Sequence, residues 1–200
     1  MYLTYNGLFE KIRFSYFYKI FKKYNIVRGM KLLDFGCGPG DMLLLSDKLG
    51  IDAYGVDEFE RSVRLANERG LNVLKANHNN LPFEENFFDV IFMQSVLEHI
   101  KDPIDALQKL KKHLKVGGIL VISCPTPGPH FWDDPTHIRP YTPKSFNILA
   151  ELCNFKSLEI NYVFSFLIGM RLTSSVFYKI MNLIPLSLGS NIIGVYRKDD

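Results

Sequence analysis

The stretch that decides the fold is Leu32-Leu33-Asp34-Phe35-Gly36-Cys37-Gly38-Pro39-Gly40. An apolar run ends in an acid, three glycines follow at alternate positions, and an amphipathic helical pattern comes next. Glycine lets the backbone adopt positive φ and approach a ligand closely, and a helix start adds free N–H groups. This stretch therefore predicts a strand, loop and helix with a small ligand at the loop.

Short apolar runs alternate with longer amphipathic runs from Lys31 to Cys124. This alternation predicts βαβ units and a parallel sheet covered on both faces. The fold class expected is α/β, with a Rossmann-like, seven-stranded, mostly parallel sheet whose last strand is antiparallel. The predicted strands are Lys31–Phe35, Ala53–Val56, Asn72–Ala76, Phe88–Met93, Ile119–Cys124, Leu158–Phe164 and Asn191–Arg197. The predicted helices between the first five strands are Met42–Leu49, Arg61–Glu68 and Ile104–Leu114.

The pattern changes after Cys124, where six prolines fall within nineteen residues. Proline density of this kind excludes helix and central strand and predicts a long ordered loop. Thr142-Pro143 then predicts a helix start, with the helix running to about Cys153, and a helix-like run follows at 172–184. With no linker or repeat, we expect one domain over 1–200: an amphipathic cap (1–30), a cofactor-binding core (31–124), and the acceptor-side loop with the C-terminal strands (125–200).

Composition limits the class of protein. The 200 residues are 47% apolar and 22% charged, as in ordinary globular proteins, and the net charge of +3 gives no support for nucleic-acid binding. Cys37, Cys124 and Cys153 lack CxxC spacing and predict reduced thiols of a cytoplasmic protein. No secretory signal opens the chain, and the longest apolar stretch, 163–170, is too short to span a bilayer.

The glycine loop differs from a dinucleotide-binding loop, which reads G-x-G-x-x-G. Here Asp41 occupies the position of the last glycine, and an acid there would repel a pyrophosphate. This disfavours a nicotinamide-dependent oxidoreductase. Asp57 ends the second predicted strand, where a carboxylate can accept hydrogen bonds from both ribose hydroxyls. Alternatively, Asp57 caps the next helix, with Glu60 at a capping-box position.

Four segments in order resemble the motifs of class I S-adenosylmethionine-dependent methyltransferases. Residues 34–40 resemble motif I, and the segment Asn79-Asn80-Leu81-Pro82-Phe83 with Asn86-Phe87-Phe88-Asp89-Val90-Ile91 resembles the family's third and fourth strands. Val96-Leu97-Glu98-His99-Ile100 and the stretch 114–123 match later blocks. The resemblance implies S-adenosylmethionine as co-substrate.

The resemblance also implies roles for individual residues. Asp34, Gly36, Cys37, Gly38 and Gly40 would cradle the methionine portion. The ribose would lie at Asp57 and Glu58, the adenine at Asn77 and His78, and the methionine amino group or reaction centre at Gln94. Many relatives carry Asp where this chain has Asn77, and the Asn carbonyl oxygen can accept the same bond.

Three histidines are candidate bases for the acceptor: His99 after the fourth strand, and His130 and His137 in the proline-rich loop. A base helps when the nucleophile is a hydroxyl or ammonium group, and ligands of this fold lie beyond the carboxyl ends of the strands. Two alternatives stay open: His99 packs beside a helix, or the loop's polar groups only satisfy one another. Asp133, Asp134 and His137 could hold a metal, but no Cys pair or HxxxH helix supports this, so we expect none.

The loop segment 134–141 and the N-terminal helix both bear on the identity of the acceptor. The stretch 134–141 is similar to a segment of bacterial methyltransferases associated with surface polysaccharides, which suggests a glycan-type acceptor. The N-terminal 30 residues mix aromatic and basic residues, typical of an amphipathic helix that packs on the sheet and caps the cofactor pocket. Alternatively, with the apolar region 163–185, that helix forms a peripheral membrane surface for an anionic or lipid-linked substrate.

The functional hypothesis is methyl transfer to an oxygen or nitrogen of a small-molecule or glycan-type acceptor. A catalytically silent S-adenosylmethionine-binding partner subunit is the alternative. Nucleic-acid methylation is not expected, because Gln94-Ser95 stands where an asparagine-proline-proline-aromatic motif would follow the fourth strand. The sequence sets neither the acceptor's identity nor the oligomeric state.

Overall fold

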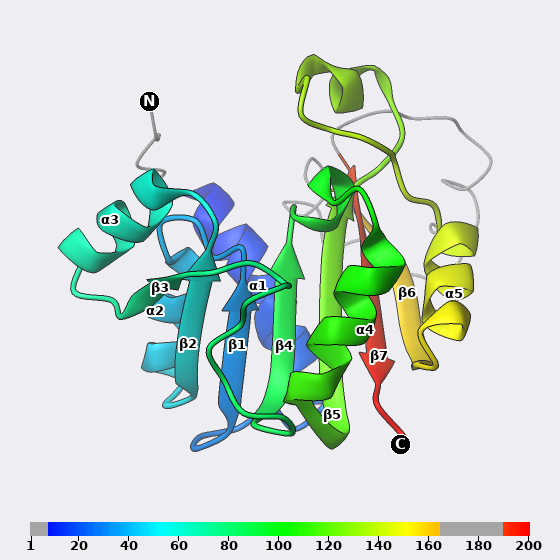
Figure 1. Ribbon diagram of the computed structural model, residues 1–200. Helices are drawn as coiled ribbons and strands as arrows, with labels where there is room; N and C mark the ends of the chain where they lie inside the picture. Colours follow the sequence, from blue (N-terminus) through cyan, green and yellow to red (C-terminus); the bar gives the residue numbers. More distant parts are fainter. Residues whose placement is uncertain (1–7, 165–189) are drawn as a thin grey trace.

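The computed structural model describes residues 8–164 and 190–200 (Figure 1). The helices are α1 (Leu8–Lys23), α2 (Asp41–Lys48), α3 (Glu60–Glu68), α4 (Pro103–His113) and α5 (Pro143–Leu152), with 3₁₀ helices η1 (Leu97–His99) and η2 (Pro129–Asp133). The strands are β1 (Lys31–Phe35), β2 (Asp52–Asp57), β3 (Val73–Lys75), β4 (Phe88–Gln94), β5 (Leu114–Pro125), β6 (Lys156–Phe164) and β7 (Ser190–Arg197).

The strands form one seven-stranded sheet in the order β3-β2-β1-β4-β5-β7-β6. The first five strands pair in parallel, and β7 is antiparallel to both β5 and β6. The predicted α/β class and the antiparallel last strand are therefore confirmed. The chain runs outward in opposite directions from β1 and from β4, so the topological switch point, where ligands of such sheets bind, lies between these two strands.

Helices cover both faces of the sheet, with α4 and α5 in front of it in Figure 1 and α1 behind it. The buried side chains of β4 alternate between the two cores, as the period of a strand requires. Ile91 belongs to the core cluster that contains residues of α4 and α5, whereas Phe92 packs with residues of α1. The rings of Phe92 and Phe17 of α1 meet edge to face at 4.8 Å between centroids. Burial on both faces explains why the strands read as nearly continuous apolar runs.

Two predicted elements differ most from those observed, whereas the bounds of the other described strands and of the helices between them differ from the prediction by at most two residues. β5 begins at Leu114, five residues before the predicted start, because α4 ends at His113 and Leu114 already pairs with Phe88. A register shift between Phe88 and Val90 then takes up the extra residues, with Gly117 at φ 79°. The prediction that the proline-rich stretch excludes helix and central strand is wrong in part, since the central strand β5 extends to Pro125 and η2 forms further along. Proline is compatible with the first turn of a helix, where its missing N–H has no partner to lose.

The ends of the chain are described in part. In α1, Phe17, Ile20 and Phe21 are buried against the sheet, while Tyr18 is exposed. The helix-like run 172–184 and most of the apolar region 163–185 lie outside the described residues. Within 8–164 and 190–200, no helix is long and apolar enough to cross a bilayer.

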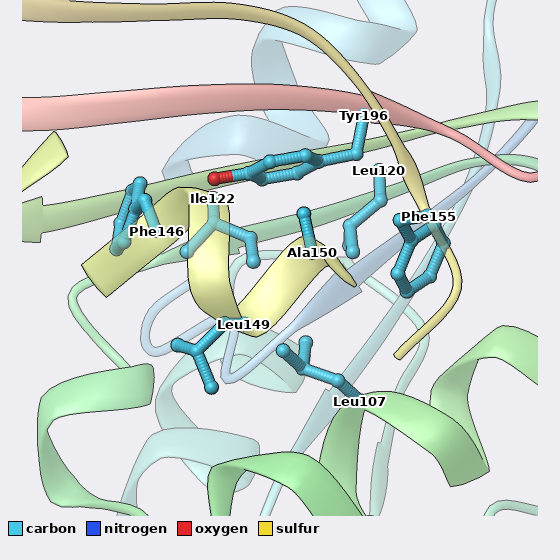
Figure 2. Close-up of a pocket in the computed structure, with 8 residues that line it drawn as sticks. All are labelled: Leu107, Leu120, Ile122, Phe146, Leu149, Ala150, Phe155 and Tyr196. Atoms are coloured by element: carbon cyan, nitrogen blue, oxygen red, sulfur yellow. The ribbon is translucent and has the colours of Figure 1, made fainter. Parts of the chain in front are cut away.

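A small gap in the apolar core lies between α4, α5 and strands β5 and β7 (Figure 2). Its lining includes Leu107, Phe146, Ala150 and Tyr196. The cavity measures about 10 Å³, which is about the space that one water needs. It is therefore a packing defect that is too small for a co-substrate or an acceptor.

Candidate cofactor and acceptor site

The glycine loop connects β1 to α2 at the carboxyl edge of the sheet, and backbone hydrogen bonds hold it to the end of β2. The amides of Gly36 and Cys37 both donate to the carbonyl of Val56, at 2.9 and 3.0 Å. Gly36, Gly38 and Gly40 have φ of 73°, 53° and 86°. Residues with a Cβ are strained in this region, so the alternating glycines are a geometric requirement of the turn.

Gly38 differs from the other two glycines in what surrounds it. A Cβ built on Gly36 would lie 2.4 Å from Val96 Cγ2, and one on Gly40 would lie 2.2 Å from Leu71 Cδ1. A Cβ on Gly38 would meet no described atom within 4 Å. Gly36 and Gly40 thus serve close packing of the protein on itself, whereas Gly38 faces open space where a ligand can approach the backbone.

Asp57 holds the loop through its side chain. One carboxylate oxygen accepts from the Gly38 amide at 2.9 Å and the other from the Phe59 amide at 2.9 Å. The carboxylate is nearly buried, at 6% exposure. The alternative with Asp57 as N-cap is wrong, because α3 begins at Glu60 with Phe59 as its N-cap. Glu60 is the first residue of the helix, bonded to Lys75, and forms no capping box.

Substituting Asp57 by Ala is expected to weaken S-adenosylhomocysteine binding by about 1.5–3 kcal/mol, the usual cost of losing a charged hydrogen-bond partner. The melting temperature should fall as well, because the amides of Gly38 and Phe59 both lose their acceptor. Titration calorimetry and thermal denaturation measure the two effects separately. An unchanged dissociation constant would remove Asp57 from the site.

The other residues predicted for the cofactor lie around the same edge, with different degrees of exposure. Asp34 is buried, with 3% of its surface exposed. Cys37 is also buried, and its own burial raises the pKa of its thiol above the ordinary value. Glu58 is exposed at the end of β2, and Gln94 is half-buried at the end of β4.

The predicted adenine segment forms a tight turn after β3. The Asn77 side-chain oxygen accepts from the Asn79 amide at 2.9 Å, and the Asn77 amide donates to Asn80 Oδ1 at 2.7 Å. His78 Nε2 lies 3.8 Å from Asp105 Oδ2. The side-chain oxygen of Asn77 keeps a second lone pair for a ligand. Its first structural task, however, is to fold this turn.

Asp41 carries less weight against a dinucleotide than the sequence suggested. Its carboxylate is paired with Arg69 at 2.8 Å, and the same guanidinium donates to the carbonyl of Pro39. The pairing offsets the negative charge at the start of α2, so repulsion of a pyrophosphate is weaker than an unpaired acid would give. The spacing of the glycines is then the main evidence against dinucleotide binding.

The acceptor side is built by η1 after β4 and by the loop after β5. His99 Nδ1 lies 3.3 Å from the carbonyl of Thr136 and 3.0 Å from its hydroxyl. That hydroxyl donates its single proton to Asp134 at 2.6 Å, so it can only accept from His99. Hydrogen bonds from the Thr136 amide and hydroxyl hold the pKa of the Asp134 carboxyl below its ordinary value.

His137 lies against His99, with ring centroids 4.8 Å apart. Its Nδ1 is 2.6 Å from the carbonyl of Phe131, and its Nε2 is 3.9 Å from Asp134 Oδ2. The loop is fixed to η1 by its backbone, since the Ile138 amide donates to the carbonyl of Glu98 at 2.8 Å. The tertiary structure therefore brings together two of the three candidate histidines, although 38 positions separate them in the sequence.

Three further residues belong to this region. His130 lies in η2, but its side chain is outside the described part of the structure. Arg139 donates to the carbonyl of Lys101 at 2.7 Å, which gives this exposed residue a part in fixing the loop. Trp132, within η2, is 62% exposed.

The sequence prediction missed Glu98 as a member of this site. Glu98 is fully buried beside the two histidines, and burial raises the pKa of its carboxyl. Its position directly before His99 was the available signal. An acid on a short 3₁₀ turn could equally face solvent, and only the packing of the later loop over it decides its burial.

A glycine loop after β1, a carboxylate at the end of β2 and polar side chains beyond β4 and β5 define an α/β domain that binds a nucleoside-type ligand at its switch point. A family model described as a methyltransferase domain matches residues 11–160. The chain belongs to this family, within the class I S-adenosylmethionine-dependent methyltransferases, for which S-adenosylmethionine is the co-substrate.

Individual relatives agree with this membership. Ubiquinone biosynthesis O-methyltransferase from Roseobacter denitrificans is 34% identical over 102 residues, which cover 48% of this chain and 41% of that protein. Demethylmenaquinone methyltransferase from Staphylococcus aureus is 32% identical over 111 residues, covering 52% and 46%. The chain thus spans about half the length of these curated relatives. The crystal structure of a SAM dependent methyltransferase from Archaeoglobus fulgidus matches with a TM-score of 0.70 at 22% identity, covering 94% of each chain, and shows a shared fold.

The residues present fit this co-substrate. The backbone of Gly38 is open to a ligand, and Asp57 sets the loop's conformation from the neighbouring strand end. These are the features that a methionine portion at the loop and a ribose at the end of β2 would require.

Proposed function

We propose that this protein transfers the methyl group of S-adenosylmethionine to an oxygen or nitrogen of a small-molecule acceptor. The observation that carries the proposal is a contact between the two halves of the site. Val96 fills the space beside Gly36, where even an added Cβ would lie 2.4 Å from its Cγ2. Two and three residues further along the chain stand Glu98 and His99. The cofactor loop and the acceptor-side cluster are therefore joined through one packed side chain.

S-adenosylmethionine supplies an activated methyl group on a sulfonium sulfur. The protein's task is then to align the nucleophile with the methyl group, because correct positioning of two reactants removes a large part of the activation barrier. Gly36 and Gly38 would position the methionine portion, Asp57 the ribose, and Asn77 and His78 the adenine. The cluster of Glu98, His99 and His137 would promote loss of the acceptor's proton.

The acceptor class is inferred from chemistry and from the relatives. A polar cluster with two imidazoles suits an ionisable hydroxyl or an ammonium group, both of which must lose a proton before or during attack. The relatives include a ubiquinone biosynthesis O-methyltransferase, whose printed name gives oxygen as the atom methylated. We therefore propose a hydroxyl-bearing small molecule as the first acceptor class to test, with a glycan-type acceptor as the second. If the acceptor is a lipid-soluble member of the first class, we expect the protein to contact the membrane surface peripherally.

A screen of acceptors, read as release of S-adenosylhomocysteine, tests the function. We expect turnover with at least one of a quinol-type phenol, a primary amine or a glycan carrying free hydroxyls. A Gly38→Val enzyme is the matched control, since it should release no product with any of them. Tight S-adenosylhomocysteine binding without turnover on any acceptor would favour the silent partner subunit. Binding of NAD in place of S-adenosylhomocysteine would contradict the proposal altogether.

A further inference from the structure

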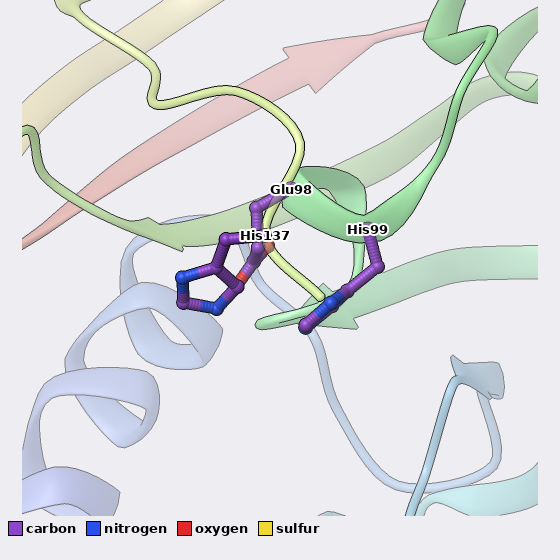
Figure 3. A group of neighbouring side chains, drawn as sticks. All are labelled: Glu98, His99 and His137. Atoms are coloured by element: carbon purple, nitrogen blue, oxygen red, sulfur yellow. The ribbon is translucent and has the colours of Figure 1, made fainter. Parts of the chain in front are cut away.

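Glu98, His99 and His137 form a compact group of potential metal ligands (Figure 3). One ligand atom from each residue lies within 4.8 Å of the other two. The residues come from two segments, η1 and the loop after η2, which meet beyond the carboxyl ends of β4 and β5. Two imidazoles and one carboxylate are the ligand set of many divalent transition-metal sites.

The hydrogen bonds of the two imidazoles leave one nitrogen of each ready to bind a cation. His137 Nδ1 contacts the carbonyl of Phe131, and His99 Nδ1 contacts the carbonyl of Thr136. Because a carbonyl oxygen can only accept, each Nδ1 must carry the N–H. In a neutral imidazole the other nitrogen, Nε2, then carries a lone pair. Metal-binding histidines characteristically donate their second N–H to a backbone carbonyl in this way.

Glu98 supplies an independent observation. Its side chain is fully buried, and neither carboxylate oxygen meets a conventional hydrogen-bond donor among the described residues. Its polar neighbours are the weak donor Cys124 Sγ, its own backbone amide and the two histidines. A buried carboxylate without a strong partner is costly, and such groups are normally paired or coordinate a metal.

We propose that Glu98, His99 and His137 bind a divalent first-row transition-metal cation at the acceptor side of the site. The proposal rests on the proposed function for the site's location and replaces the sequence-based expectation of no metal. The sequence pattern did not indicate this set of three ligands, because the usual signals are closely spaced ligands and His137 follows His99 by 38 residues.

The geometry is compatible with a cation after small side-chain adjustments. Ligand atoms around a tetrahedral zinc-like ion are about 3.4 Å apart, so the three atoms need to approach one another by no more than about 1.4 Å. Three protein ligands leave at least one coordination position open, as in catalytic sites. Asp134, with Oδ2 3.9 Å from His137 Nε2, adds negative charge at the rim.

This site would refine how the acceptor loses its proton. An acceptor hydroxyl at the open position would give its proton to water more readily. Its oxygen would then form the new O–C bond while the C–S bond breaks and the electron pair remains on sulfur. The imidazoles would hold the ion and would not themselves take the proton.

Titration of the full-length, metal-stripped protein with Co²⁺ tests the site without any acceptor. We expect visible absorption bands of a nitrogen-coordinated ion to develop to one equivalent. His99→Ala, His137→Ala and Glu98→Gln should each weaken Co²⁺ binding more than about 100-fold, because even partners outside the ligand set cost 10–100-fold. His113→Ala is the matched control: His113 ends α4, its Nδ1 lies 3.1 Å from the carbonyl of Glu84, and the Co²⁺ spectrum should stay unchanged.

The outcomes separate this proposal from the proposed function. The metal site would be overturned if the Co²⁺ bands were absent, or if they persisted in both His99→Ala and His137→Ala. Methyl transfer that continues unchanged in excess chelator would overturn it too, while leaving the methyltransferase proposal intact. Normal Co²⁺ binding in a protein that does not bind S-adenosylhomocysteine would contradict the function and retain the metal site.

Discussion

Gly38→Val should reduce S-adenosylhomocysteine binding at least about 100-fold, equivalent to about 2.8 kcal/mol, in a protein that still folds. A Cβ at this position would meet no described atom within 4 Å, so we expect the protein to accommodate the added side chain and a ligand to meet it. A valine at φ 53° is also strained, which costs about 1–2 kcal/mol of stability. Titration calorimetry with S-adenosylhomocysteine measures the first effect and thermal denaturation the second.

Gly29→Val is the matched control for this prediction. Gly29 has φ 83°, and its Cβ would also meet no described atom within 4 Å. It lies in the turn before β1, at the opposite end of that strand from the glycine loop. The two variants should lose similar stability, and only Gly38→Val should lose binding. Equal binding by both would show that the glycine loop has a task other than cradling the co-substrate.

Replacing His137 by Ala should lower turnover about 10²–10⁴-fold, the usual contribution of a group that assists removal of the acceptor's proton, whether His137 acts on the proton directly or through a bound cation. S-adenosylhomocysteine affinity should hardly change, because His137 lies on the loop after β5, whereas the predicted cofactor contacts lie at the ends of β1, β2, β3 and β4. The variant should also melt at a lower temperature, since the ring packs on Phe131 at 4.4 Å and bonds its carbonyl. Steady-state kinetics with saturating co-substrate measures the effect.

His137→Asn separates chemistry from packing. An asparagine N–H can replace Nδ1–H as donor to the carbonyl of Phe131, so much of the loop's stability should return. It lacks the Nε2 lone pair, so turnover should stay low. Recovery of turnover along with stability would show that His137 is structural, and His99 would then be the residue to test.

Only part of the site was predictable, and the reason is sequence separation. Asp57 was placed at the site from its position at a strand end, but its bonds to Gly38 and Phe59 were not. These bonds depend on the parallel pairing of β1 with β2, which brings the end of one strand beside the loop after the other. The pairing of Asp41 with Arg69 has the same origin. Local patterns do not specify which side chains meet across a sheet.

The sequence by itself determined the class of fold and the cofactor loop, because both follow from short-range rules. Apolar periodicity sets strand and helix, and alternating glycines are needed wherever the turn requires positive φ. Only the tertiary structure decided that His99 and His137 face each other over Glu98. That arrangement depends on the loop after β5 folding back onto η1 through the bond from the Ile138 amide to the Glu98 carbonyl. Contacts between distant segments arise from the packing of the whole sheet, and no pattern within either segment contains them.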